Sequence, residues 1–320
     1  MQPRALPFGT ADVLTVVASG STYLAVPIAL RGFSPTALTA LRLGVATLVL
    51  GGMLGAGWRR GRARPRLDGR TLIRVAIGGA VGFAGYSLLL NTGQQSVDPG
   101  TTSLLLNATP LFSAVLGGVL LRERQGQRGW AGLLIGFTGT GLVAFADGSG
   151  TLRLSYGALC VLGAALTVSI FTIVQQPILS RLGALEATAG AALAGLLCTC
   201  YALPDAVRGI TNAQPSVLAA GLYLGIGSTA IGYTAWAASM RRGGVGDGTA
   251  ILYAVPIVTI VLEAVLLGSH PSLLGAGGGL LAFGGVWLGR SGRSGAGAVE
   301  EAELEHDDEA FARVGEVEAG

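Results

Sequence analysis

Residues 102–110 read TSLLLNATP, and residues 248–256 read GTAILYAVP. The two stretches lie 146 positions apart with no gap, and both end in proline. The match continues further along, because the same offset places Phe137 on Phe283. A match held at one fixed offset indicates that the chain contains an internal repeat.

The repeat lies in a sequence that is too apolar for a soluble protein. Hydrophobic residue types make up 51% of the 320 residues and charged types only 12%, whereas a soluble domain carries about 25% charged residues. Nine of the 18 acidic residues lie in residues 300–320, and seven of the 21 arginines lie in residues 59–74. This composition excludes a soluble enzyme and a disordered chain, and it indicates a helical protein that crosses the membrane several times.

Ten apolar stretches, bounded by Arg, Pro, Asp and Gly, are long enough to cross about 30 Å of hydrocarbon as helices. In order, they cover residues 9–30, 36–57, 72–93, 100–121, 128–146, 156–179, 184–203, 216–239, 247–268 and 273–290. Continuous apolar runs of about 20 residues do not fit the alternating strands of a membrane β-barrel. The sequence therefore predicts an all-α integral membrane protein with ten transmembrane helices.

The arginines indicate in which direction the helices cross. With the N-terminus inside, the inner segments hold 16 arginines, whereas the outer loops hold three, namely Arg31, Arg153 and Arg208. Because arginine gathers on the cytoplasmic side, we expect both termini in the cytoplasm and the protein in the cell (cytoplasmic) membrane. Most arginines lie where helices meet lipid headgroups, so the net charge of +3 does not predict a nucleic-acid partner. The first apolar run lacks a small-residue cleavage site, so we expect no cleaved signal peptide.

The repeat divides the chain into two units of five spans, residues 9–148 and 152–290. Because five is odd, the second unit crosses in the opposite direction, as in the inverted repeats of secondary transporters, whose substrate site lies near the membrane midplane. The ends of equivalent spans agree with this inversion. Arg122 and Arg124 lie at an inner end, and the equivalent end in the second unit, which would face outside, has no arginine. We expect residues 1–8 to form a cytoplasmic N-terminus and residues 294–320 to form a disordered, acidic cytoplasmic tail.

Three short motifs occur in order: Gly20-Ser-Thr-Tyr-Leu-Ala-Val-Pro27, Pro35 with Ala40-Leu-Arg42, and Ser103-Leu-Leu-Leu through Pro110 to Leu121-Arg-Glu123. With these motifs the chain resembles the EamA-type transporters of the drug/metabolite transporter (DMT) superfamily, from residue 9 to about residue 290. The resemblance implies ten helices in two inverted five-helix repeats, and movement of small metabolites, often amino acids or related compounds, usually outward. The chain departs from the family pattern at Ser269, where the second-half equivalent of Glu123 would stand.

Glu263 lies inside the ninth apolar stretch, between Ile260-Val-Leu and Ala264-Val-Leu-Leu267. A charge at membrane depth costs at least ~2.5–3.5 kcal/mol, and such residues usually face a bundle interior or a water-filled cavity. Glu263 is therefore a candidate substrate-pathway residue and proton carrier. The alternative is a structural acid, hydrogen-bonded to a neighbouring helix or wetted at the outer interface. Proton coupling is a hypothesis, and no cofactor is expected.

Pro110 and Pro256 are equivalent in the repeat, and each removes a hydrogen bond from its helix. Kinked helices at matching positions point to a transporter's substrate site, although proline also makes simple packing kinks in membrane helices. Asn107 and Tyr253 each lie three residues before one of these prolines, so they could line a central cavity from opposite halves.

Further polar-tipped side chains inside the spans complete the candidate pathway. They are Asn91, Tyr23, Tyr86, Tyr233 and Trp236. Tyrosine and tryptophan also serve in interfacial belts or in cores, and asparagine can form an interhelical hydrogen bond, so both interpretations stay open. Arg42, a turn or two inside the second span, could extend to the outer headgroups, or it could bind an anionic group such as a substrate carboxylate or Glu263.

The remaining special residue types predict packing rather than chemistry. Two histidines, His270 and His306, are too few for a metal cluster, and Cys160, Cys198 and Cys200 lie inside apolar runs, so we expect neither a metal site nor a disulfide. Glycines four positions apart permit close helix contact. The pairs are Gly132 and Gly136, Gly275 and Gly279, and Gly285 and Gly289. Spans five and ten could therefore pack on each other, or on a second copy in a homodimer.

Together these features favour a secondary transporter, not an enzyme, with a small-molecule substrate and the lipid bilayer as partners. We expect alternating access around a midplane cavity, with substrate touching spans one, three, four, six, eight and nine. Export of amino acids or related metabolites is the leading interpretation, and efflux of hydrophobic drug-like compounds is the alternative. A membrane-embedded lipid-processing protein would need a cluster of His, Asp or Glu at a membrane face, and the sequence offers none.

Overall fold

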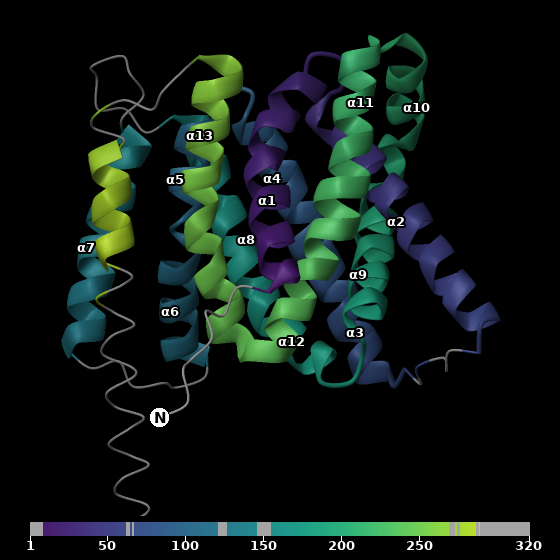
Figure 1. The fold of residues 1–320 in the computed structure, drawn as a ribbon, viewed down its shortest axis with the longest axis horizontal. Coiled ribbons are helices and arrows are strands. Elements are labelled where there is room, and N and C mark those ends of the chain that lie inside the picture. Colours follow the sequence, from purple (N-terminus) through teal and green to yellow (C-terminus); the bar gives the residue numbers. More distant parts are fainter. Residues whose placement is uncertain are drawn as a thin grey trace, which may run out of the picture.

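The computed structural model describes residues 9–61, 65, 67–120, 127–145, 155–268, 273, 276–285 and 288. Within these residues all regular structure is helical, and the longer helices run side by side (Figure 1). Six helical segments there are long and apolar enough to cross a membrane: Thr10–Ala29, Pro35–Arg59, Gly69–Gly93, Tyr156–Leu179, Ala184–Asn212 and Pro215–Arg241. Two shorter apolar helices cover Val255–Leu266 and Ala276–Gly285. The predicted helical class is confirmed, while the count of ten spans stays a prediction.

The helices of the first half, in order, are α1 (Thr10–Ala29), α2 (Pro35–Arg59), α3 (Gly69–Gly78), η1 (Gly79–Gly85), α4 (Tyr86–Gly93), α5 (Pro99–Leu106), α6 (Thr109–Leu120) and α7 (Gln127–Phe145). Several of their starts are set by side chains that accept a hydrogen bond from the first turn, as the sequence allows. Asp68 accepts from the Thr71 amide and Asp98 from the Thr101 amide. Proline at the first turn of α2 and α5 favours the same starts.

The second half continues with α8 (Tyr156–Leu179), α9 (Ala184–Thr199), η2 (Cys200–Ala202), α10 (Leu203–Asn212), α11 (Pro215–Tyr223), η3 (Leu224–Gly232), α12 (Tyr233–Ala250), η4 (Ile251–Ala254) and α13 (Val255–Leu267). The sequence predicts a loop at residues 240–246, between spans eight and nine. This prediction is wrong, because α12 continues through these residues. Glycine costs a helix only about 1 kcal/mol, so the glycines after Arg242 were a weak stop signal.

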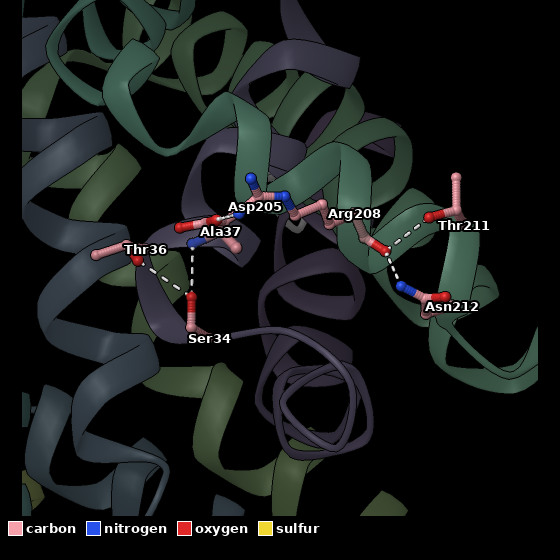
Figure 2. Close-up of polar contacts among 7 residues, drawn as sticks. All are labelled: Ser34, Thr36, Ala37, Asp205, Arg208, Thr211 and Asn212. Carbon is pink, nitrogen blue, oxygen red and sulfur yellow. Dashed lines mark hydrogen bonds and ion pairs between the residues drawn. The ribbon is translucent and has the colours of Figure 1, made fainter.

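A second difference lies between spans seven and eight, where residues predicted as a loop form α10. Figure 2 shows this corner of the molecule: Ser34 Oγ accepts from the Ala37 amide at 3.2 Å, while Arg208 pairs with Asp205 at 3.1 Å. Each contact lies within its own helix, the first at the start of α2 and the second in α10, so neither of them connects the two helices. Phe33, at the turn before α2, is buried in one apolar cluster with residues of α10 and α11, and this packing holds α10 in place.

At another surface, Asp68 at the start of α3 pairs with Arg181, which follows α8, at 2.7 Å. Hydrogen bonds from Thr71 and then from Arg181 lower the pKa of Asp68 to about 2. The carboxylate therefore stays ionised across the physiological range. This exposed ion pair joins the first half of the chain to the second.

Two helices contain a π-helical segment, η1 and η3, and the 146-residue offset places Gly79 of η1 on Gly225 of η3. Both segments lie where glycine lets another helix approach closely. A Cβ on Gly79 would overlap Ala191 and Ala194 of α9, and a Cβ on Gly225 would come within 2.6 Å of Val45 of α2. π-Helical turns of this kind are frequent at functional sites.

The glycines of α7 pack against the helix formed by residues 276–285 within the same chain. A Cβ on Gly139 would overlap the Ala282 backbone, and a Cβ on Gly285 would overlap the Gly136 backbone. This confirms the first of the two interpretations given to these glycines, in which spans five and ten pack on each other. Gly132 and Gly136 approach Gly285 directly, so they need no second copy of the chain to explain them, and a homodimer stays a prediction.

Candidate functional site

A cavity of about 80 Å³ lies among the helices where α5 ends and α13 begins. Its wall is formed by Ser19, Thr22, Tyr23, Arg42, Tyr86, Ser103, Leu106, Asn107, Thr109, Pro110, Val168, Ser228, Gly232, Tyr233, Trp236, Leu252, Val255 and Pro256. These residues come from both halves of the chain and from all six spans expected to touch substrate. Arg42 adds α2 to that set.

The cavity meets a break in one helix. The amides of Asn107 and Ala108 donate three residues back, to Leu104 at 3.1 Å and Leu105 at 3.0 Å, so α5 ends there and α6 begins at Thr109. Pro110 has no amide hydrogen to donate to Leu106, which prevents a continuous helix. In α8, Ser169 Oγ donates to the Thr109 carbonyl at 2.8 Å and holds the start of α6.

The equivalent place in the second half is also irregular. The short 3₁₀ segment η4 connects α12 to α13, and Pro256 lies in the first turn of α13. Pro110 and Pro256 both line the cavity. The two prolines paired by the sequence repeat therefore meet at one place in space.

Arg42 is 1% exposed and lies in the cavity wall. Its Nε donates to Thr229 Oγ1, and its Nη2 donates to Ser228 Oγ at 3.0 Å. Both acceptors belong to η3, the π-helical segment, and Thr229 Oγ1 in turn donates to the Leu224 carbonyl at 2.8 Å. The interpretation that Arg42 extends to the outer headgroups is wrong, because these hydroxyl groups hold the guanidinium inside the bundle.

Aromatic side chains form another part of the wall. The Tyr233 ring lies 4.5 Å from that of Phe83, 6.0 Å from that of Trp236 and 6.4 Å from that of Tyr86, measured between ring centroids. Such edge and tilted arrangements are the favoured ones for aromatic pairs. Tyr86, Tyr233 and Trp236 thus belong to a packed aromatic cluster that also faces the cavity. Tyr23 lines the cavity too and lies in the same buried cluster as Tyr86.

Eight of the eleven predicted pathway residues line the cavity, namely Asn107, Pro110, Pro256, Tyr23, Tyr86, Tyr233, Trp236 and Arg42. Asn91 and Glu263 do not. Asn91 is fully buried and donates to Thr39 Oγ1 at 3.0 Å, which is the interhelical hydrogen bond named as its alternative role. Tyr253 belongs to η4, and its side chain lies outside the described part of the structure.

Glu263 is 2% exposed and lies away from the cavity wall, in α13. Its Oε2 contacts Gly100 so closely that a Cβ there would overlap the carboxylate. Asp98, the N-cap of α5, lies beside the same place. Glu263 is therefore a buried acid at the start of α5, while the cavity begins at the other end of that helix.

Sequence reasoning missed the short hydroxyl side chains of the wall. They are Ser19, Thr22, Ser103, Thr109 and Ser228. Their residue type carries little signal, because serine and threonine in helices commonly bond their own backbone, as Thr22 does to Ala18 at 2.6 Å and Ser103 to Gly100 at 2.7 Å. The one available signal was the proximity of Ser103 and Thr109 to Pro110. Among the described residues, no group of three or more His, Cys, Asp or Glu could hold a metal ion.

Comparison with known proteins identifies the family. The model of the EamA-like transporter family matches the chain twice, at residues 11–145 and 155–289. The chain belongs to the EamA-like transporter family. An EamA-like transporter of this type is a member of the DMT superfamily and a membrane protein, as its apolar helices and relatives agree.

Several relatives of this EamA-like transporter carry transport names. A protein of Streptantibioticus cattleyicolor, named as a probable terminal-alkyne amino-acid exporter, is 36% identical over 86% of this chain and 91% of its own length. An uncharacterized transporter of Bacillus subtilis, YdfC, is 30% identical over 83% and 85%. A protein of Salmonella typhimurium, named as a probable amino-acid metabolite efflux pump, is 22% identical over 88% and 93%.

The fold is shared with a protein of known crystal structure. The two superpose with a TM-score of 0.59 over 89% of this chain and 98% of the other, at 22% sequence identity. At that identity the likeness supports the fold alone. It agrees with the helical arrangement described above.

Proposed function

We propose that this EamA-like transporter exports amino acids or related small metabolites across the cytoplasmic membrane by alternating access. The chain would form two inverted five-helix repeats, residues 9–148 and 152–290, with both termini in the cytoplasm. The double match to the family model supports the two-unit division. The names of the relatives from Streptantibioticus cattleyicolor and Salmonella typhimurium support the substrate class.

One observation carries the proposal: the cavity is built from both halves at two equivalent helix breaks. Unwound or interrupted helices at matching positions are where secondary transporters hold their substrates. The second equivalence, between the π-helical segments η1 and η3, supports the same two-fold relation. Alternating access would then move one set of helices against the other around this cavity.

The test is exchange of radiolabelled amino acid by the purified, full-length protein in proteoliposomes. L-Leucine and L-propargylglycine, a terminal-alkyne amino acid, are the first substrates, with a cationic hydrophobic dye as a probe for the alternative. Exchange of the amino acids supports the proposal. Movement of the dye without the amino acids would support efflux of hydrophobic drug-like compounds, which the aromatic part of the cavity wall could also accept.

A matched pair of variants in α8 connects this activity to the cavity. Val168 lines the cavity, whereas Leu166, two residues earlier, is 37% exposed on the outside of the bundle. Val168→Trp fills the cavity and should reduce exchange by about tenfold or more, while Leu166→Trp should leave it within about twofold. Equal effects of the two variants would separate the activity from this cavity.

Glu263 gives the proposed transporter a candidate proton carrier. It is buried in α13 against the start of α5, and the two helices pack against each other. Protonation of a buried acid between two moving helices would change how those helices pack, which is how a proton gradient could drive the substrate cycle.

A further inference from the structure

The Arg42 guanidinium uses only part of its hydrogen-bonding capacity. Nε and Nη2 donate to Thr229 and Ser228, while Nη1 is buried with no hydrogen-bond partner among the described residues. Hydrogen bonds from an arginine are normally made in a planar fork that matches a carboxylate. Protein hydroxyl groups therefore fill the Nε and Nη2 side of the fork, while Nη1 has no such partner among the described residues.

The charge of Arg42 also lacks a counter-charge from the described part of the protein. Both of its partners are neutral hydroxyl groups, and no described carboxylate lies within ion-pair distance of it. Buried acids elsewhere are engaged at other places: Asp12 accepts from the Gly9 amide at the start of α1, and Glu263 lies against Gly100. Because arginine keeps its proton and a buried unpaired charge is costly, these surroundings favour an anionic ligand beside Arg42.

The remainder of the cavity indicates which kind of anion fits. Its aromatic part, formed by Tyr86, Tyr233 and Trp236, suits an apolar side chain. At the C-terminal end of α5, where Leu106 and Asn107 line the cavity, backbone carbonyls favour a positive group. One buried water needs about 10–15 Å³, so 80 Å³ accepts a molecule the size of an amino acid rather than a large drug.

We propose that Arg42 binds the carboxylate of the transported substrate through Nη1, and that it thereby restricts this transporter to small carboxylates such as amino acids with apolar side chains. The proposal rests on the proposed function, which it narrows to one chemical group of the substrate. Ser228 and Thr229 are positioning residues that hold the guanidinium toward the cavity. Amines and esters of the same shape lack the anion and are rejected.

The test compares three compounds that share one side chain: L-leucine, L-leucine methyl ester and 3-methylbutylamine. Binding to the purified protein in detergent is measured by thermal stabilisation and calorimetry in chloride-free buffer. We expect L-leucine to bind about 30-fold or more tightly than the ester or the amine, because truncating one partner of a buried charged pair has an effect of this size. This comparison needs no mutation, so a folding defect cannot obscure it.

Variants then assign the preference to Arg42. Arg42→Gln should lose the preference for L-leucine over its ester, and Arg42→Lys should retain part of it. Arg31→Gln, which removes an exposed arginine between α1 and α2, is the matched control and should keep the full preference. An unchanged preference in Arg42→Gln would overturn the proposal, as would equal binding of the three compounds by the wild-type protein.

The outcomes separate this proposal from the proposed function. Binding of L-leucine with the expected preference, but no exchange in proteoliposomes, supports the role of Arg42 and contradicts the transport function. Exchange of the ester and the amine as fast as L-leucine supports transport and overturns the role of Arg42. Stabilisation by chloride alone, with none by L-leucine, L-propargylglycine or 4-methylpentanoate, would show a site for inorganic anions and also overturn it.

Discussion

Arg42 and Glu263 are both buried ionisable residues inside apolar helices, but they lie in different surroundings. Arg42 faces the cavity and is held by two hydroxyl groups of η3, whereas Glu263 lies against Gly100 at the start of α5. In the sequence each carried two interpretations, because the depth of a residue and its distant partners are set by helix packing. The structure assigns Arg42 to the cavity, and the proton-carrier role of Glu263 stays a prediction.

Glu263→Gln tests that role directly. Glutamine keeps the size and the hydrogen-bonding character of the side chain but cannot carry a proton. Uphill transport of L-leucine driven by a pH gradient should be lost, while exchange without a gradient should stay within about twofold of wild type. Both rates are measured in the same proteoliposomes. The control is Asp205→Asn, which changes an exposed acid of α10; gradient-driven transport that survives in Glu263→Gln would contradict the role.

Asn91 and Asn107 show why the role of a single polar residue is hard to predict from the sequence. Asn91 and Asn107 are both polar residues inside apolar spans, and an interhelical hydrogen bond was the alternative role for each. Asn91 is fully buried against Thr39, while Asn107 lies at the end of α5 beside the cavity. Only the proline three residues after Asn107 distinguished it, because that proline ends a helix there.

At the scale of elements, the break between α5 and α6 should matter for movement more than for stability. Pro110→Ala restores an amide hydrogen that could donate to Leu106 and make one continuous helix. Stability should be unchanged or higher, by up to about 3 kcal/mol, while exchange should fall by about tenfold because the cavity loses its irregular wall. Thermal unfolding in detergent and exchange in proteoliposomes measure the two effects. Pro177→Ala, inside α8 and outside the cavity wall, is the control; equal losses of exchange in the two variants would count against this prediction.

The close contact of α7 with residues 276–285 gives a stability prediction with a control on the same helix. A Cβ on Gly139 would overlap the Ala282 backbone, but a Cβ on Gly141 would meet nothing within 4 Å. Gly139→Leu should therefore destabilise the protein by about 1–3 kcal/mol or more, and Gly141→Leu should have little effect. Thermal unfolding in detergent compares them, and equal melting temperatures would mean that the two helices do not pack in this way.

Elements were predictable to the extent that they depend on local sequence. The apolar runs predicted the spans. In the structure Asp68, Asp98 and Ser155 cap three helix starts, and such caps depend on local sequence alone. The π-helical segments were not predictable. η1 and η3 arise where glycines let α9 and α2 approach, and that approach is known only once the helices are packed.

At the scale of the whole molecule, the internal repeat was the strongest sequence signal, because it pairs residues that lie far apart along the chain. Pro110 and Pro256, paired by the 146-residue offset, meet at one cavity. The hydroxyl partners of Arg42 could not be found this way, because Ser228 and Thr229 lie in the other half of the chain and are not its equivalents in the repeat.

The last prediction concerns the orientation of the chain in the membrane, with both termini in the cytoplasm. Two exposed arginines allow it to be tested. Arg181, between α8 and α9, has a side chain 56% exposed, and Arg208, in α10, has one 77% exposed. Because inner segments hold 16 arginines and outer loops three, Arg181 should face the cytoplasm and Arg208 the outside.

Arg181→Cys and Arg208→Cys, each in a chain whose three native cysteines are replaced by serine, place one thiol on each side. A membrane-impermeant maleimide should label Arg208→Cys in intact cells and Arg181→Cys only after permeabilisation. The reverse pattern would invert the whole molecule, and labelling of both variants in intact cells would contradict an odd number of crossings between the two positions.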